Sequence, residues 1–160
     1  MAEATGWQPR LWSLATFLAL TLGGGTAIGI LTGPDAWYTS LAKPAFNPPN
    51  WVFGPVWSAL YVMIGVAGWL VWKSRRSTAA LSLWWTQLAL NFLWSPVFFA
   101  MHGIGMALIV ISLLLVTIWA FVAVTVHQCL RAALLFVPYG LWVAFATLLN
   151  GSLYLLNRAQ

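Results

Sequence analysis

Long stretches without a charged side chain are the feature of this chain that most limits how it can fold. Asp, Glu, Lys and Arg are absent from Ser77 to Leu130, and also from Leu11 to Pro34, from Pro44 to Trp72 and from Ala132 to Asn157. A soluble domain needs charge on its surface, whereas a charged side chain at the centre of a bilayer costs roughly 2.5–3.5 kcal/mol. We therefore expect most side chains to face lipid.

The length of these segments predicts how often the chain crosses the membrane. About 20 apolar residues span a hydrocarbon core of roughly 30 Å, and the His102-Gly103 pair is the natural break in the longest segment. We therefore predict an all-α integral membrane protein, a single bundle of five transmembrane helices that forms one domain over residues 1–160. The spans are expected near residues 11–32, 51–72, 79–101, 104–126 and 132–155.

The basic residues lie beside the predicted helix ends, so they indicate topology rather than nucleic-acid binding. Five crossings place most of them on the same side as the N-terminus: Arg10, Lys73, Arg75, Arg76 and Arg131, against Lys43 and Arg158 on the other side. In a bacterial membrane the positive-inside rule then predicts a cytoplasmic N-terminus. A mitochondrial outer membrane is the alternative location, and there the rule is a poor guide.

The connection over residues 33–50 is the one long loop in the prediction. It carries the aromatic residues Trp37, Tyr38 and Phe46, and four prolines restrict its backbone. Long loops within compact domains are usually functional or disordered, and this composition does not indicate disorder. We expect a stiff lid over one end of the bundle. The alternative is an interfacial loop whose aromatic rings lie among the lipid headgroups.

Large aromatic residues recur with amides and phenols at helical spacing in three of the predicted spans. The stripes are Phe53, Trp57 and Tyr61; Gln87, Asn91, Trp94 and Phe98; and Tyr139, Trp142, Ala146 and Asn150. An unpaired amide in hydrocarbon costs several kcal/mol, so these faces should point inward and converge beneath the long loop. Two interpretations stay open: interhelical hydrogen bonds within a filled core, or a cavity for a flat, mostly apolar ligand.

Residue patterns typical of catalysis or metal binding are not visible in the sequence. His102 and His127 are predicted at opposite sides of the membrane, Cys129 is the single cysteine, and no paired carboxylates or nucleophile–base set can be recognised. We therefore assign no catalytic residues and no metal site.

Three segments together resemble the translocator protein (TspO, peripheral-type benzodiazepine receptor, TspO/MBR) family. They are WYTSLAKPAFNPPNWVFGPVWSALY, QLALNFLWSPVFF and VPYGLWVAFATLLN, in the family's order between about Gly33 and Asn150. The resemblance implies a five-helix membrane protein, commonly a homodimer, that requires no cofactor. Its implied ligands are porphyrins such as protoporphyrin IX and haem, together with sterols and benzodiazepine-type drugs.

The resemblance also implies a ligand site beneath the first loop. The matching positions are Trp37, Phe46, Asn47, Trp51, Phe53, Trp57, Tyr61, Asn91, Trp94, Trp142, Ala146 and Asn150. We expect the asparagines to fix polar groups of a tetrapyrrole and Lys43 to meet a propionate, in a protein that transports or senses tetrapyrroles or regulates their metabolism. The alternatives are an enzyme that degrades protoporphyrin in light, and a membrane scaffold, regulator or sterol-binding protein.

Overall fold

The computed structural model of the protein describes residues 8–74 and 77–158, and within these ranges the chain is almost entirely helical and contains no strand. The all-helical prediction is therefore confirmed. Arg75 and Arg76, which entered the topology prediction, lie outside the described residues.

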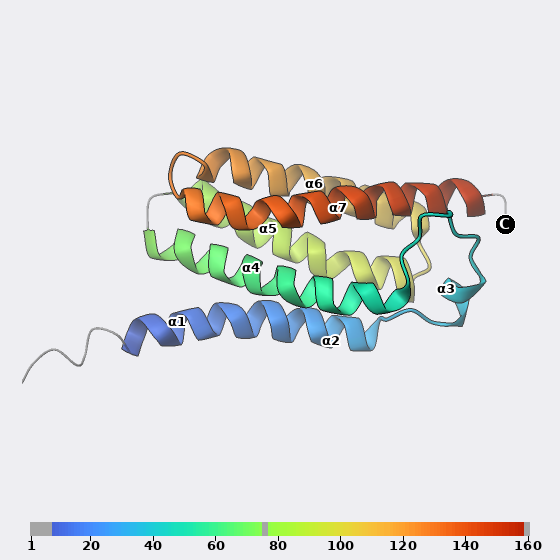
Figure 1. Ribbon diagram of the computed structural model, residues 1–160, viewed down its shortest axis with the longest axis horizontal. Helices are drawn as coiled ribbons and strands as arrows, with labels where there is room; N and C mark the ends of the chain where they lie inside the picture. Colours follow the sequence, from blue (N-terminus) through green and yellow to red (C-terminus); the bar gives the residue numbers. More distant parts are fainter. Residues whose placement is uncertain (1–7, 75–76, 159–160) are drawn as a thin grey trace, which may run out of the picture.

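Five long helical rods run side by side along the molecule (Figure 1). The first rod is continuous through α1, η1 and α2, and the third continues from α5 into η3; both η1 and η3 are π-helical. The bounds are α1 (Gln8–Leu18), η1 (Ala19–Gly23), α2 (Gly24–Leu31), α3 (Ala36–Ser40), the 3-10 turn η2 (Asn50–Val52), α4 (Phe53–Ser74), α5 (Thr78–Ser95), η3 (Pro96–Ala100), α6 (Ile104–Thr125) and α7 (Leu130–Asn157).

Four of the rods are long and apolar enough to cross a membrane: Leu11–Leu31, Asn50–Ser74, Ile104–Thr125 and Leu130–Asn157. The remaining predicted span, near 79–101, falls on α5 and η3, which are helical but less apolar. The difference has a local cause, because Gln87 and Asn91 lower the hydropathy of α5 although both side chains are buried in the bundle.

Close helix packing in the core depends on a glycine that faces an indole. Trp84 of α5 is fully buried, and its Nε1 donates to the carbonyl oxygen of Ile64 in α4 at 2.9 Å. A β-carbon at Gly68, one turn further along α4, would overlap this indole ring. Gly68 therefore lets α4 and α5 approach closely enough for the hydrogen bond to form.

Gly25 and Gly29, which are four residues apart in the first rod, have different surroundings. A β-carbon at Gly25 would overlap the ring of Tyr61 in α4, whereas one at Gly29 would meet no heavy atom within 4 Å. The small residue at Gly25 therefore serves packing inside the bundle, between the first rod and α4.

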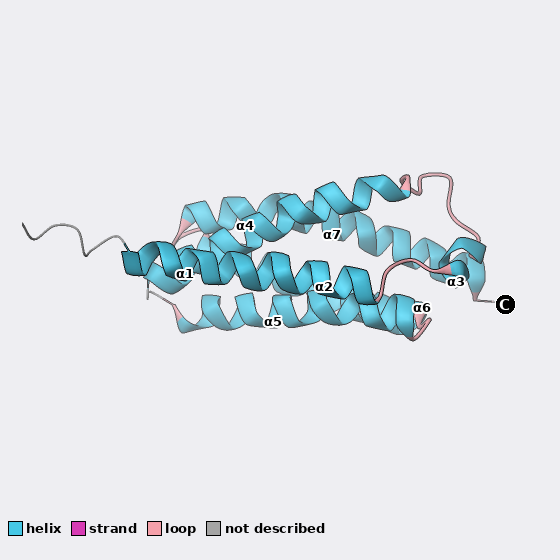
Figure 2. Ribbon diagram, turned by 90° about the horizontal axis from the view of Figure 1, so that it is seen from below, coloured by secondary structure: helices cyan, strands magenta, loops and turns pink. Residues whose placement is uncertain are grey.

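The first loop lies at the end of the bundle where α7 finishes (Figures 1 and 2). Asp35 is the N-cap of the short helix α3, and its Oδ1 accepts a hydrogen bond from the backbone N–H of Tyr38 at 3.0 Å. Tyr38 and Leu41 are buried in a small cluster that includes Phe98 of η3. The loop is thus anchored by its own apolar residues, as its composition suggests.

Two polar contacts hold the loop against the bundle. The side-chain amide of Asn157 accepts from the backbone N–H of Ala42 and donates to its carbonyl oxygen, both at 3.0 Å. Asp35 pairs with the Nε2 of His102 at 3.3 Å, and the ring of Trp37 stacks on the His102 imidazole at 4.2 Å. The loop is therefore attached both to the end of α7 and to the connection between η3 and α6.

These contacts also perturb two ionisable groups of the loop. The backbone N–H of Tyr38, with a smaller contribution from His102, holds the pKa of the Asp35 carboxyl below its usual value. Burial raises the pKa of the Tyr38 hydroxyl. Asp35 is therefore ionised, and Tyr38 neutral, near neutral pH.

Replacing Gly68 with alanine should destabilise the protein, because the added methyl group forces α4 away from Trp84. We expect a loss of about 1–3 kcal/mol, the usual effect of overpacking a tight core. The thermal unfolding midpoint of the purified protein in detergent measures it. Gly23→Ala is the matched control, since a β-carbon there meets no heavy atom within 4 Å. Equal midpoints for the two variants would contradict this account of the α4–α5 contact.

Removing the Asn157 amide should loosen the first loop. In Asn157→Ala the backbone N–H of Ala42 loses its acceptor, so its hydrogen exchange should accelerate about 2- to 12-fold, the equivalent of one net hydrogen bond. Hydrogen–deuterium exchange mass spectrometry of the loop peptide measures this rate. Ser152→Ala, on the same helix but with its hydroxyl bonded to Leu148, is the control and should leave the rate unchanged. An unchanged rate in Asn157→Ala would mean that other contacts hold the loop.

Candidate functional site

A cavity of about 460 Å³ lies in the half of the bundle nearest the first loop. Its walls come from every long rod, and the loop over residues 33–50 contributes Gly33, Pro34, Tyr38 and Asn50. Small-molecule sites usually have volumes of about 300–1,000 Å³ and mostly apolar walls. The cavity is therefore large enough to be a ligand site.

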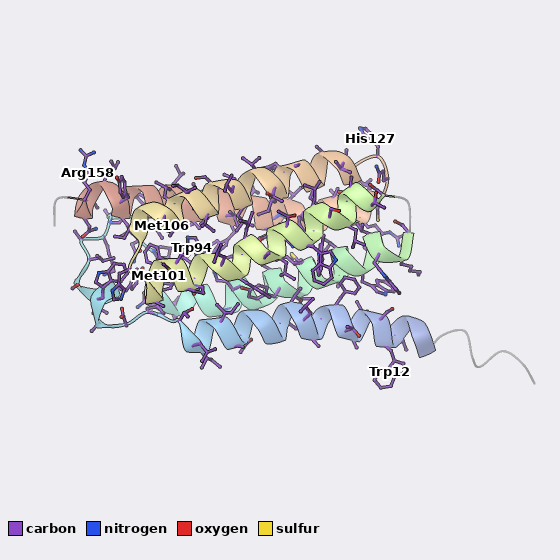
Figure 3. All side chains as sticks on the ribbon, turned by 180° about the vertical axis from the view of Figure 1, so that it is seen from behind. Trp12, Trp94, Met101, Met106, His127 and Arg158 are labelled. Atoms are coloured by element: carbon purple, nitrogen blue, oxygen red, sulfur yellow. The ribbon has the colours of Figure 1, made fainter. Side chains whose placement is uncertain are left out.

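Eight of the twelve residues predicted for the site line this cavity: Phe53, Trp57, Tyr61, Asn91, Trp94, Trp142, Ala146 and Asn150. All eight belong to the three helical stripes, so the structure brings the stripes together. Figure 3 shows Trp94 inside the bundle, toward the end that carries Arg158, while Trp12 projects outward from α1 at the other end.

The other four predicted residues, all near the first loop, lie outside the cavity wall. Trp51 and Phe46 are 75% and 51% exposed, and Trp37 is engaged with His102. Asn47 accepts a hydrogen bond from the Tyr38 hydroxyl at 3.5 Å. A role for these four in ligand binding stays a prediction.

The wall of the cavity is built from aromatic pairs. Trp57 stacks on Tyr61 with ring centroids 5.5 Å apart, and Trp94 stacks on Phe98 at 5.2 Å. Trp142 meets the edge of Phe53 at 5.9 Å. Such a wall favours a ligand with a broad flat face, since stacked rings gain roughly 0.5–1.5 kcal/mol per pair beyond the area they bury.

A chain of hydrogen bonds leads from the cavity wall into the core and joins three helices. The hydroxyl of Tyr61 in α4 donates to Asn91 Oδ1 at 2.9 Å, and Asn91 Nδ2 donates to the hydroxyl of Tyr139 in α7 at 2.9 Å. Tyr139 then donates to Gln87 Oε1 at 3.0 Å. Each of these four side chains thus has a partner, as a low-dielectric interior requires.

Asn150 forms a second polar connection, between the third rod, α6 and α7. Its Oδ1 accepts from the indole Nε1 of Trp94 at 3.1 Å, and its Nδ2 donates to the backbone carbonyl oxygen of Ile104 at 3.0 Å. Asn91 and Asn150 therefore act as interhelical connectors while they also line the cavity. The interhelical hydrogen bonds of the first interpretation are present, and they lie beside a cavity, while a ligand in that cavity stays a prediction. Each amide keeps some further bonding capacity.

Trp142 differs from the other polar side chains of the wall. Its Nε1 is buried and has no hydrogen-bond partner among the described residues. An unsatisfied buried donor costs about 1–3 kcal/mol relative to a bonded one. Neighbouring atoms cover this Nε1 in the structure, so a ligand acceptor would remove that penalty only after the indole turns toward the cavity.

Lys43, which we expect to meet a propionate, is not among the residues that line the cavity. Its ammonium donates to the carbonyl oxygens of Tyr38, Thr39 and Leu41 at 2.7, 3.1 and 3.2 Å, and it lies over the Tyr38 ring. These three bonds occupy all three of its hydrogens. Lys43 therefore stabilises the fold of the loop, and would have to exchange these bonds to reach a carboxylate.

Sequence reasoning missed two parts of the wall. The first rod contributes Gly25, Thr26, Ile28 and Gly29, and α6 contributes Ile111 and Leu114. The small residues of the first rod were a usable signal, because they permit both close packing and an opening between helices. The two aliphatic residues of α6 could not be distinguished from lipid-facing ones.

Comparisons with known proteins match most of the chain to one family. The model of the TspO/MBR family matches residues 17–155. A tryptophan-rich sensory protein from Cereibacter sphaeroides is 41% identical over 151 residues, which is 91% of this chain and 92% of the relative. Protein CrtK from Rhodobacter capsulatus is 35% identical over 148 residues, covering 90% and 91%. The human translocator protein is 43% identical over 122 residues, covering 71% and 70%. With its long apolar helices, this chain is therefore a membrane protein of the TspO/MBR family.

Proposed function

We propose that the cavity binds a tetrapyrrole, protoporphyrin IX or haem, and that the protein transports or senses this ligand. The observation that carries the proposal is the aromatic wall beneath the first loop, in which Trp57, Trp94 and Trp142 surround a space of about 460 Å³. A porphyrin is flat and largely apolar, and it carries acceptor atoms in its ring and propionates. It therefore matches both the ring faces and the unpartnered N–H of Trp142.

We propose also that the chain crosses the membrane five times, with α5 and η3 as the third crossing. The polar side chains that lower the hydropathy of α5 are bonded to neighbouring helices, so they do not face lipid. With a cytoplasmic N-terminus, the cavity would lie in the half of the bundle away from the cytoplasm. Ligand would then enter beneath, or beside, the first loop.

Protoporphyrin IX titrated in the dark should quench the protein's tryptophan fluorescence saturably. A Trp57→Ala, Trp142→Ala double variant should bind about tenfold more weakly or worse, because two ring contacts are lost. Trp12→Ala is the control, since Trp12 is 73% exposed and far from the cavity. Unchanged affinity in the double variant would contradict the proposal.

The alternative function, degradation of protoporphyrin in light, is tested by illuminating the same samples. An enzyme requires that the porphyrin absorbance is lost faster with folded protein than with denatured protein.

The N–H of Trp142 gives a sharper prediction. Trp142→Phe keeps an aromatic ring but removes the donor, so tetrapyrrole affinity should fall about 2- to 12-fold. The thermal unfolding midpoint of the ligand-free variant should stay the same or rise, because an unsatisfied donor has been removed. Trp12→Phe should change neither quantity. A lower midpoint together with unchanged affinity would mean that Trp142 Nε1 serves the free fold and not the ligand.

A further inference from the structure

A second hollow lies on the outside of the bundle, on the half away from the first loop. It is an open groove of about 480 Å³ and shares no residue with the cavity. Its walls come from α1, η1, the end of α4 and the beginning of α5: Ser13, Thr16, Phe17, Leu20, Trp72, Leu81 and Trp85. None of these residues takes part in the proposed tetrapyrrole site.

The groove is apolar and open to its surroundings. Trp72 and Trp85 are 43% and 49% exposed, and Leu20 is 37% exposed. Phe17 forms part of its base, with its ring 6.1 Å from Trp72 and 5.1 Å from the buried Trp84. Tryptophan is enriched where a membrane protein meets the lipid headgroups. The groove therefore has the shape and chemistry to hold a hydrocarbon chain at one edge of the membrane.

A cation stands beside this groove without a carboxylate partner among the described residues. The Nζ of Lys73 lies 4.9 Å from the ring centroid of Trp69, and Trp69 Nε1 donates at 3.0 Å to Ser13, a residue of the groove wall. Asp35, the acidic residue among the described residues, instead contacts the Nε2 of His102 at 3.3 Å, at the opposite end of the bundle. The whole chain has two acidic residues, and the other, Glu3, lies outside the described residues.

We propose that the groove binds an anionic phospholipid, with one acyl chain along Phe17, Leu20 and Trp85 and the phosphate beside Lys73. Basic residues next to apolar surfaces between transmembrane helices are the usual setting for anionic headgroups. A second copy of the chain is a poorer occupant of the groove. In a dimer that joins the two grooves, the basic ends of both copies would lie together, and their like charges would repel.

Native mass spectrometry of the full-length protein in detergent tests the headgroup. Phosphatidylglycerol should be retained more strongly than phosphatidylcholine with the same acyl chains. Lys73→Gln should weaken phosphatidylglycerol binding about fivefold, the effect of one surface cation, and leave phosphatidylcholine unchanged. Arg158→Gln is the control, because Arg158 lies at the opposite end of the bundle. Equal retention of the two lipids, or equal effects of the two substitutions, would overturn the proposal.

A second pair of variants tests the groove itself. Thr16→Trp places a large ring in the groove and should abolish the retained phosphatidylglycerol while tetrapyrrole binding persists. Val116→Trp, on an exposed face of α6 outside the groove, should retain the lipid as the unmodified protein does. The thermal unfolding midpoint shows that each variant is folded. Retained lipid in folded Thr16→Trp would overturn the proposal. So would a Thr16→Trp protein that dissociates from dimer to monomer while its lipid binding is unchanged, because a second copy of the chain would then occupy the groove.

Discussion

In a lipid environment, polar side chains need partners inside the protein, and one chain of hydrogen bonds meets this need for much of the bundle. Tyr61, Asn91, Tyr139 and Gln87 connect α4, α5 and α7 in a single sequence of donors and acceptors. Tyr139 and Gln87 are fully buried, so a lost partner there would leave a polar group unsatisfied, and the register and rotation of the three helices are therefore coupled to one another. The cavity wall is set by the same residues, because Tyr61 and Asn91 belong to both.

The two ends of the molecule differ in how their charges are balanced. At the end with the first loop, Asp35 pairs with His102, and Lys43 is bonded to backbone carbonyl oxygens. At the other end Lys73 lies over an indole ring with no carboxylate partner in the described part of the chain. At the end with the first loop, the charged groups of that loop are thus bonded within the protein, and this end closes the cavity. The opposite end is basic, and we propose that it binds anionic lipid.

Family membership, the shape of the cavity and the polarity of its wall are three separate observations that bear on the type of ligand. The cavity would indicate a flat apolar ligand in any protein, because its amides are largely engaged with neighbouring helices. The small remaining polarity, which includes the unused bonding capacity of Asn91 and Asn150, restricts which flat molecules are stabilised there. We propose a tetrapyrrole as that ligand because it is flat, largely apolar and carries a few acceptor atoms.

The sequence by itself determined the helices and the inward faces of three of them, because charge-free length and a repeat of three to four residues are local properties. Only the tertiary structure decided that the first rod and α6 complete the cavity, that Trp51 and Phe46 lie outside it, and that Lys43 serves the loop. In lipid both faces of a helix are apolar, so hydropathy does not reveal which aliphatic residues face a cavity. The partner of an amide depends on helix rotation and depth, which arise from packing between helices.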